Sequence, residues 1–212
     1  MKCVIFAGGE KVSKDSIDYD FIHDSYVISA DKGYELASSL NVKSNLLIGD
    51  FDSIDKVPNN EIKKTFPREK DDTDLMLAIK EGLAVGCTEF VIYGATGGRL
   101  DHMIGNIQCL MYLNDHNANG KIISDTENVM LLSPGKYKIK NKKNFSLSLI
   151  SYSQKVTGLY ISGTKYETTD CVLENNFPLG ISNEILPEND YAIIEFKSGT
   201  LLVIQSYLLT KF

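Results

Sequence analysis

Short apolar runs alternate with amphipathic segments along the first half of the chain. Four runs have the length and β-branched content of buried strands, and each ends in small or acidic residues. They occupy residues 4–9, 26–31, 45–50 and 90–95. Apolar residues also recur three or four positions apart, as on the buried face of a helix, at residues 34–40, 73–85 and 103–113. Strand followed by helix, repeated along the chain, predicts an α/β fold with a largely parallel sheet.

The pattern changes near Asn119-Gly120, beyond which apolar and polar residues alternate with a period of two. Phe and Leu alternate with Ser over residues 145–149. Residues 191–196 and 201–205 flank Lys197-Ser198-Gly199-Thr200, a pattern that predicts a β-hairpin. We therefore predict two domains: an α/β domain over residues 1–120 and an all-β sandwich over residues 121–212.

Composition limits which partners the protein can bind and in which cell compartment it works. The 212 residues are 43% hydrophobic and carry a net charge of -6, which supports a folded core and argues against nucleic acid or anionic membranes as primary partners. No apolar run approaches the ~20 residues of a membrane span, so we predict a cytoplasmic protein. The four cysteines are widely spaced, which indicates buried reduced thiols rather than disulfides or a zinc site. Lys136, Lys138 and Lys140 alternate with apolar residues, as on the solvent-facing side of a strand.

Acidic residues gather where the predicted strands end. Asp31 follows the second run, Asp50 and Asp52 follow the third, and Asp101 lies a few residues after the fourth. The carboxyl ends of parallel strands meet at one edge of an open sheet, where ligands bind. Several carboxylates there would repel one another unless a cation lay among them, and Mg²⁺ prefers oxygen ligands. The sequence therefore predicts a Mg²⁺ site that handles phosphate groups.

Two acidic motifs carry this prediction, and each also has a purely structural interpretation. In Gly49-Asp50-Phe51-Asp52-Ser53 the spacing of two places both carboxylates on one side of an extended segment, although acids are also common in ordinary loops. Lys70-Asp71-Asp72-Thr73-Asp74 directly precedes a predicted helix, where Asp and Thr also serve as caps. A cap accounts for one or two of these residues but not readily for three acids and Lys70, so Asp71 and Asp74 are the functional candidates.

A glycine-rich turn leads from the fourth run into a predicted helix, with the sequence Gly97-Gly98-Arg99-Leu100-Asp101-His102. Free backbone N–H groups and the positive end of the helix dipole form an anion-binding arrangement. The Arg99 guanidinium adds a charged fork that suits phosphate oxygens. Asp101 could instead be the N-cap of the helix. The turn matches neither the Walker A nor the GxGxxG pattern.

Taken in order, the motifs GDFDS, KDDTD and GGRLDH resemble those of the thiamine pyrophosphokinase family. In the second half, Gly163-Thr164-Lys165-Tyr166 and Gly180-Ile181-Ser182-Asn183-Glu184 resemble motifs of that family's second domain. The resemblance covers nearly the whole chain. Each motif alone is weak, but the ordered set is specific.

The resemblance implies transfer of pyrophosphate from ATP to the hydroxyl of thiamine, giving thiamine diphosphate and AMP, with Mg²⁺ as cofactor. It also implies a homodimer in which residues 1–120 bind ATP and Mg²⁺, and residues 121–212 bind thiamine and mediate dimerisation. By matching positions, the metal ligands would be Asp50, Asp52, Asp71 and Asp74. The ATP and phosphate contacts would be Asp31, Lys70, Thr73, Gly97, Gly98 and Arg99. The thiamine contacts would be Asp101, Ser182 and Asn183, and the catalytic residues would be the four metal-binding aspartates with Arg99 and Asp101.

Two features depart from the family pattern. Lys32 stands where the family often has a small residue, and the chain has no Trp, which some members stack on the thiamine pyrimidine. Tyr166 or Phe177 could take the place of that Trp, and the sequence does not choose between them.

The chemistry of the residues agrees with phosphoryl-type transfer, which depends on positioning and charge neutralisation more than on covalent help. In-line attack of the thiamine hydroxyl on the β-phosphorus of ATP would release AMP, and either Asp71 or Asp101 could accept the proton. Two other functions stay open at this point. One is a different metal-dependent enzyme, such as a phosphohydrolase or a glycosyltransferase, and the other is a non-catalytic protein that binds thiamine or nucleotide.

Overall fold

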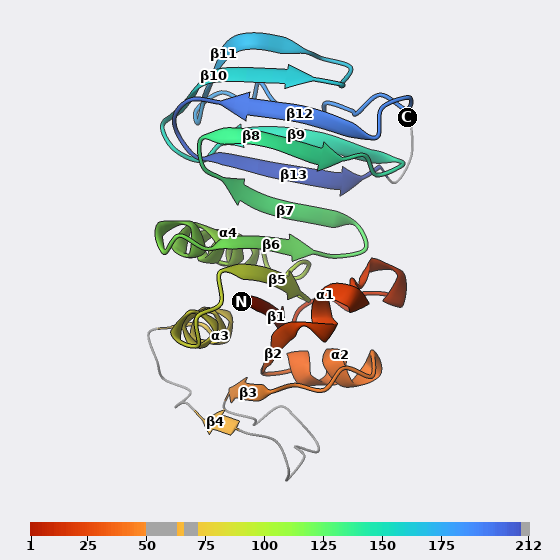
Figure 1. Ribbon diagram of the computed structural model, residues 1–212, viewed down its shortest axis with the longest axis vertical. Coiled ribbons are helices and arrows are strands. Elements are labelled where there is room, and N and C mark those ends of the chain that lie inside the picture. The colour runs from red at the N-terminus through yellow and green to blue at the C-terminus, as the bar shows by residue number, and fades with distance from the viewer. Residues whose placement is uncertain (50–62, 66–71, 209–212) are drawn as a thin grey trace. The chain divides into compact units, whose positions relative to one another are not determined.

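The computed structural model describes residues 1–49, 63–65 and 72–208 (Figure 1). The chain forms two compact units, Met1–Asp125 and Thr126–Phe212. The predicted site residues Asp50, Asp52, Lys70 and Asp71 lie outside the described residues. None of the described helices is both long and apolar enough to cross a membrane.

The first unit is built on a parallel sheet, in which the described strands follow the order β4-β3-β2-β1-β5-β6. They are β1 (Lys2–Phe6), β2 (Ser25–Ala30), β3 (Leu46–Gly49), β4 (Lys63–Thr65), β5 (Glu89–Tyr93) and β6 (Asn119–Ile123). The central strands β1, β3 and β5 are almost entirely buried, because helices cover both faces of such a sheet. The predicted α/β fold is confirmed, and β6 extends this unit past residue 120, where we placed the domain boundary.

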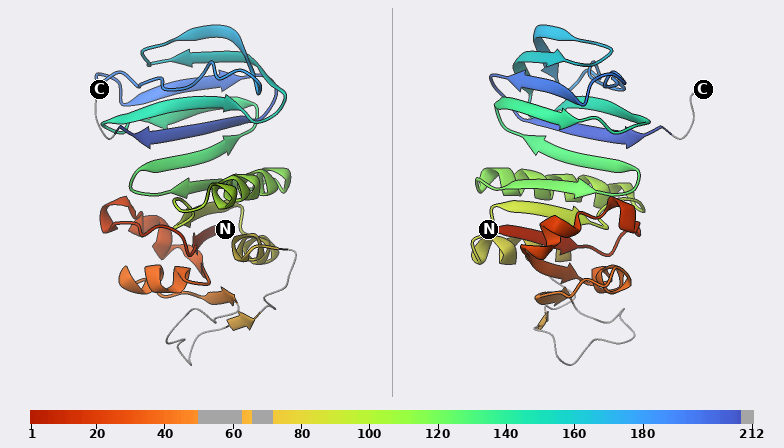
Figure 2. Two further views of the ribbon diagram at one scale, coloured as in Figure 1. Left: turned by 180° about the vertical axis from the view of Figure 1, so that it is seen from behind. Right: turned by 45° about the vertical axis from the view of Figure 1, so that its right-hand side comes forward.

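Helices cover both faces of the parallel sheet (Figure 2). They are α1 (Tyr19–His23), α2 (Gly33–Ser39), α3 (Asp74–Ala84) and α4 (Leu100–Asp115), with a short 3-10 turn at Lys14–Ser16. On one face, Leu36 of α2 and Ile22 of α1 share a core with Val4 and Phe6 of β1. On the other face, α3 packs so closely that a Cβ on Gly82 would come 2.6 Å from the Phe90 ring. A bulkier residue at position 82 would therefore push α3 off the sheet.

The second unit consists of two antiparallel sheets that share one core. Its strands are β7 (Glu127–Leu132), β8 (Gly135–Lys140), β9 (Phe145–Ser151), β10 (Lys155–Ser162), β11 (Thr168–Glu174), β12 (Tyr191–Phe196) and β13 (Leu201–Tyr207). Strand β13 pairs with β7 and β9, while β12 pairs with β8 and β10, and β10 with β11. Leu147 and Val203 from the first sheet pack with Leu159 and Ile194 from the second. The predicted all-β sandwich is confirmed.

The predicted hairpin of residues 191–196 and 201–205 is wrong. Both segments are strands, β12 and β13, but they belong to different sheets. The connection between them crosses from one sheet to the other and is tied to β10, because Thr157 N donates to Ser198 O at 3.2 Å and Lys197 N donates to Thr157 O at 2.9 Å. Gly199 in this connection has a φ of 92°, a conformation that favours glycine. The turn residues therefore mark a crossover between sheets rather than a hairpin.

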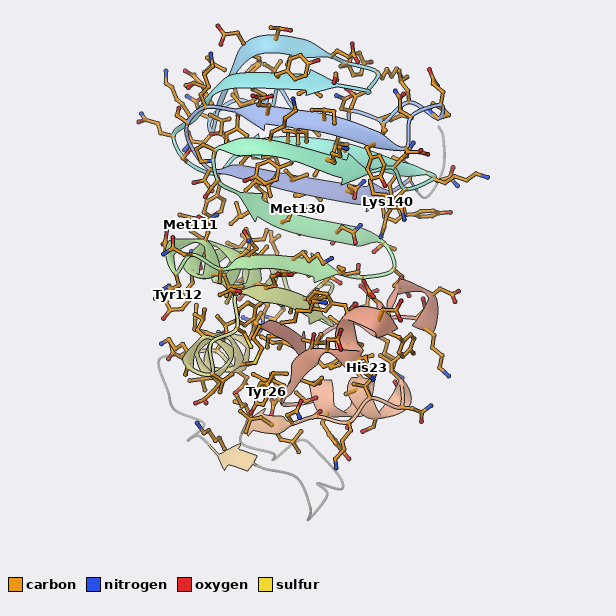
Figure 3. All side chains as sticks on the ribbon, in the orientation of Figure 1. His23, Tyr26, Met111, Tyr112, Met130 and Lys140 are labelled. Carbon is orange, nitrogen blue, oxygen red and sulfur yellow. The ribbon has the colours of Figure 1, made fainter. Side chains whose placement is uncertain are left out.

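The lysine-rich segment forms β8, the outer strand of its sheet. Lys136, Lys138 and Lys140 are exposed, whereas Ile139 is buried, so the predicted solvent-facing side of a strand is confirmed. Lys140 is marked in Figure 3. Lysines on an outer strand also discourage unwanted pairing with other chains.

Candidate functional site

A cavity of about 600 Å³ lies at the carboxyl ends of β1, β2 and β5 in the first unit. We call it the glycine-loop cavity, after residues 94–98, which form part of its wall. Residues 7–9 follow β1, Asp31 follows β2, and residues 94–99 join β5 to α4. The remaining lining residues are the last residue of β2, two residues directly before α3, and residues in the first turn of α3 and the first two turns of α4: Ala30, Asp72, Thr73, Asp74, Leu75, Asp101, His102, Gly105 and Asn106. Parallel pairing brings these segments to one edge of the sheet, as the sequence predicts.

Backbone hydrogen bonds join the two glycine-containing segments of this cavity. Gly9 N donates to Gly94 O at 2.7 Å, and Glu10 N donates to Thr96 O at 3.1 Å. The segments lie so close that a Cβ on Gly9 would be 2.9 Å from Thr96 O. Gly97 and Gly98 have φ values of 75° and 72°, which other residues adopt only with strain. Glycine is therefore needed here for close approach and for the reversal of the chain.

Helix α4 begins directly after the glycine loop, with its N-terminus at the cavity. Its N-cap is Arg99, which makes no side-chain capping hydrogen bond. The interpretation of Asp101 as the N-cap is therefore wrong, because Asp101 lies inside the first turn. The first amides of a helix lack partners within the helix and attract anions. This end of α4 is thus suited to a phosphate group.

Arg99 and Asp101 form a two-point ion pair at the mouth of the cavity. Arg99 Nε donates to Asp101 Oδ1 at 3.1 Å, and Arg99 Nη2 donates to Asp101 Oδ2. Both side chains are more than half exposed. The hydrogen bonds raise the pKa of Arg99 above its ordinary value and lower the pKa of Asp101 below its ordinary value. Asp101 therefore stays ionised in mildly acidic solution, but it is a weaker base than an isolated carboxylate.

Two further acids of the cavity come from the start of α3. Asp72 accepts a hydrogen bond of 2.6 Å from Lys80 Nζ, and this bond raises the pKa of Lys80. The ammonium also lies 5.9 Å from the centre of the Tyr112 ring on α4, which Figure 3 labels. Asp74 is the first residue of α3, after the N-cap Thr73, whose Oγ1 accepts from Met76 N. The cap interpretation is therefore confirmed for Thr73, and Asp72 has a cationic partner of its own.

Asp31 occupies an unusual backbone conformation at the end of β2. Its φ is 52°, a left-handed value that is uncommon outside glycine and is often found at functional sites. Asp31 N donates to Ile48 O of β3 at 2.8 Å. A Cβ on Gly49 would lie 2.6 Å from Asp31 Oδ1, so Gly49 leaves room for this carboxylate. Gly49, directly before Asp50, therefore lies beside the Asp31 side chain.

The donor set of the cavity suits a hard cation, because its ligands would be carboxylate oxygens. Among the described residues, no three His, Cys, Asp or Glu side chains converge as a metal centre. Of the four predicted metal ligands, Asp74 is the one that the structure describes, and it lines the cavity. Mg²⁺ is commonly held by one or two carboxylates and completed by substrate phosphates and water. The described residues therefore fit a metal ion that binds together with a phosphate ligand.

A second cavity, of about 590 Å³, lies in the β unit, and we call it the β-unit cavity. Its lining is largely apolar, with Leu149, Leu159, Ile161 and Leu173. Tyr166, 62% exposed, also lines it, whereas Phe177 does not. A flat aromatic ring beside an apolar recess suits a planar ligand.

Ser182 and Asn183 both line the β-unit cavity, but their polar atoms differ in availability. Ser182 is exposed, has a φ of 61° and donates its backbone N–H to Ser148 Oγ. Asn183 is buried, and its Oδ1 accepts from the backbone N–H groups of Tyr166 and Glu184, at 3.0 and 2.9 Å. Its Nδ2 donates to Tyr166 O and Thr164 Oγ1, at 2.8 and 3.1 Å. The Asn183 amide thus joins the two motifs of the second half, and the Ser182 hydroxyl is the more accessible group.

Sequence reasoning missed two features of the glycine-loop cavity. Asn106 on α4 donates through Nδ2 to Ala95 O at 2.8 Å. Thr96 is buried, and its hydroxyl has no hydrogen-bond partner among the described residues. A polar Asn among the apolar residues of a predicted helix was the one signal available in the sequence.

Comparisons with known proteins match both halves of the chain. The family model for the catalytic domain of thiamin pyrophosphokinase matches residues 20–122, and the model for its vitamin B1 binding domain matches residues 136–201. Thiamine pyrophosphokinase of Bacillus subtilis (strain 168) is 32% identical over 210 residues, covering 95% of this chain and 97% of that protein. The first matched segment includes the GDFDS, KDDTD and GGRLDH motifs, and the second includes Ser182 and Asn183.

Solved structures of thiamin pyrophosphokinases have the same fold as this chain. The crystal structure of thiamine pyrophosphokinase from Bacillus subtilis superimposes with a TM-score of 0.88, at 27% identity, over 99% of this chain and 100% of that one. Thiamin pyrophosphokinase from Candida albicans superimposes with a TM-score of 0.75, over 97% of this chain and 88% of that one. At 16% identity the second likeness concerns the fold alone.

Proposed function

The chain belongs to the thiamin pyrophosphokinase family. On this premise we propose which of its two cavities binds each substrate when ATP and thiamine are converted into AMP and thiamine diphosphate. The triphosphate of ATP binds in the glycine-loop cavity, and thiamine binds in the β-unit cavity. The observation that carries the proposal is the glycine loop, which leads into Arg99 and the N-terminus of α4, all on the wall of one cavity.

The glycine-loop cavity offers donors for phosphate oxygens. The amides of Gly97 and Gly98 donate to no backbone carbonyl of the described residues. Together with the amides of Leu100 and Asp101 at the start of α4 and the Arg99 guanidinium, they would hold the triphosphate. Lys70 and Thr73, from the segment before α3, and Asp31 stay predicted ATP contacts.

We propose that Mg²⁺ binds with ATP and is held by Asp74 together with Asp50, Asp52 and Asp71. Bound there, it would neutralise charge on the phosphate oxygens. The thiamine hydroxyl oxygen then forms a bond to the β-phosphorus, and the bond from that phosphorus to the oxygen of the α-phosphate breaks, so that AMP leaves. An aspartate accepts the hydroxyl proton. Arg99 and the backbone amides orient the phosphates in line for this transfer.

In the β-unit cavity, Tyr166 is our choice for the aromatic that faces thiamine, because it lines the cavity and Phe177 does not. The Ser182 hydroxyl would form a hydrogen bond with thiamine. Asn183 and Asp101 stay predicted contacts, although the Asn183 amide already makes four hydrogen bonds within the protein. Its contribution to thiamine binding would thus come through the shape of the turn that carries Tyr166.

The function is tested by measuring AMP release from Mg²⁺-ATP with and without thiamine. We expect AMP to form in a one-to-one ratio with thiamine diphosphate, and only when thiamine is present. AMP release that does not depend on thiamine would favour a hydrolase instead. No release under either condition would point to a binding protein that retains the fold.

The Ser182→Ala variant should raise the KM for thiamine roughly fivefold, the effect of losing one net hydrogen bond of about 1 kcal/mol. The KM for ATP should stay unchanged, because Ser182 lies in the β unit and ATP would bind in the α/β unit. Steady-state kinetics with each substrate varied in turn measures both constants. Ser198→Ala removes an exposed hydroxyl of the same unit that is not part of the cavity, and it should leave both KM values alone. An unchanged thiamine KM in Ser182→Ala would count against this acceptor site.

We also propose that the protein is a cytoplasmic homodimer without nucleic-acid or membrane partners. In support, Phe177 and Leu179 are 64% and 57% exposed, which suits an interface of the β unit. The four cysteines are free, as is usual in a reducing compartment. Light scattering on the purified protein measures the oligomeric state.

A further inference from the structure

Three consecutive carbonyl groups of the glycine loop are anchored on two different elements. Gly94 O and Thr96 O accept from the backbone N–H groups of Gly9 and Glu10, at 2.7 and 3.1 Å. Ala95 O, between them, accepts from the side chain of Asn106 at 2.8 Å. The loop is thus held by the segment after β1 and by helix α4.

The bond from Asn106 is the one side-chain hydrogen bond to residues 94–98 among the part of the chain that the structure describes. These residues need such a support, because Gly94, Gly97 and Gly98 all have positive φ values and glycine restricts the backbone least. Without the bond to Ala95, the peptide groups between β5 and α4 could rotate. The amides of Gly97 and Gly98 would then no longer present a fixed pair of donors to the cavity.

Asn106 is also well placed to act on a ligand through this loop. It lies in the second turn of α4, is half-buried and lines the same cavity as Arg99 and Asp74. Helix α4 is 16 residues long and packs on β6 and α3, so it is a rigid base for the side chain. A neutral carboxamide can donate to a carbonyl without adding negative charge beside the phosphates.

We propose that Asn106 is a positioning residue for the triphosphate of ATP, holding the glycine loop so that its amides meet the phosphate oxygens. This role rests on the proposed placement of ATP in the glycine-loop cavity. It gives Asn106 no contact with thiamine and no part in proton transfer. Its loss should therefore weaken ATP binding in the ground state and the transition state alike, which raises KM and leaves kcat nearly unchanged.

The test is Asn106→Leu, which keeps the approximate size of the side chain but removes the donor. We expect the KM for ATP to rise at least ~10-fold, a factor that corresponds to about 1.4 kcal/mol. The KM for thiamine should stay within ~2-fold and kcat within ~3-fold, since uniform binding is what is lost. Calorimetric titration of the protein with Mg²⁺-ATP, in the absence of thiamine, should show the same loss of affinity.

Gln108→Leu is the matched control, because Gln108 is an exposed amide on the same helix that does not line the cavity. It should leave all constants unchanged. If Asn106→Leu does not fold, Asn106→Ala removes the same donor without adding bulk or charge and should also weaken ATP binding. An ATP affinity equal to that of the wild-type protein in a folded variant at position 106 would overturn the proposal. The AMP-release assay on the wild-type protein tests the proposed function separately.

Discussion

The Asp74→Asn variant should convert ATP and thiamine at least ~100-fold more slowly than the wild-type protein, the scale of losing one electrostatic contact to a transition state. Asp74 is the first residue of α3 and lines the glycine-loop cavity. Asn has nearly the same shape but no charge, so it would be a poorer ligand for Mg²⁺ beside the phosphates. The measurement is kcat at saturating ATP, Mg²⁺ and thiamine, together with the thermal midpoint Tm.

The neighbouring Asp72→Asn variant is the matched control. Asp72 also lines the cavity, but it forms an ion pair with Lys80 and is not a position carried over from the family motif. Its kcat should stay within about threefold of wild type, because Asp72 already pairs with Lys80 and is not one of the proposed metal ligands. Neither variant should lower Tm by more than a few degrees, since removing one of several like charges relieves repulsion. A kcat of Asp74→Asn equal to that of the wild-type protein would contradict the proposed role of Asp74 as a metal ligand.

Asp50→Asn and Asp52→Asn should show the same loss of at least ~100-fold in kcat. Both residues lie outside the described part of the chain, so this expectation rests on their spacing in GDFDS and on the family resemblance. Wild-type turnover in either variant would contradict the predicted metal site.

The helices of the α/β unit were predictable to the extent that their apolar faces are buried. The predicted helices at 34–40 and 73–85 are α2 and α3, whose Leu36, Leu75 and Ile79 are in the core. Helix α4 begins at Leu100, three residues before the predicted start. The first turn holds the polar residues Asp101 and His102 and an exposed Leu100, so this turn is not held by burial of an apolar face.

Strand pairing was harder to predict than the strands themselves. The segments that became β12 and β13 were recognised from their alternation, and Gly199 was recognised as a turn residue. Turn residues indicate that the chain reverses locally, but they do not say which strands become neighbours. The pairing is decided by burial on both sheets, where Ile194 of β12 and Val203 of β13 enter one core from opposite sides. Such contacts depend on residues distant in sequence, which local patterns do not contain.

The acidic edge was predictable because parallel strands bring their carboxyl ends together, whatever the loops do. The ion pair of Asp72 with Lys80 was not, because its partners are eight residues apart and lie outside the usual helical spacing of three or four. Asn106 was likewise not predicted, since its role depends on a carbonyl eleven residues earlier in the chain. Residues that bind ligands directly are marked by their chemistry, whereas residues that hold a loop are revealed by the fold.

The Arg99→Met variant should lower kcat/KM for ATP by ~100-fold, because it removes the charged fork that would meet the phosphates. Arg99→Lys keeps the charge but loses the two-point geometry, so its kcat/KM for ATP should lie between those of Arg99→Met and the wild-type protein. Neither change should lower Tm noticeably, since Arg99 and Asp101 are both largely exposed. A kcat/KM for ATP equal to wild type in Arg99→Met would contradict the role of Arg99 at the phosphates.

The same variant distinguishes the two candidates for the general base. Arg99 lowers the pKa of Asp101 in the wild-type protein, so in Arg99→Met that pKa should rise toward the ordinary carboxylate value. If Asp101 accepts the thiamine proton, activity requires its ionised form. The acid limb of the profile of kcat against pH should then move to higher pH in Arg99→Met. If Asp71 is the base, the acid limb should stay in place while the overall rate falls, because Asp101 then contributes no titration to catalysis. The position of the acid limb in Arg99→Met therefore decides which of the two aspartates accepts the proton.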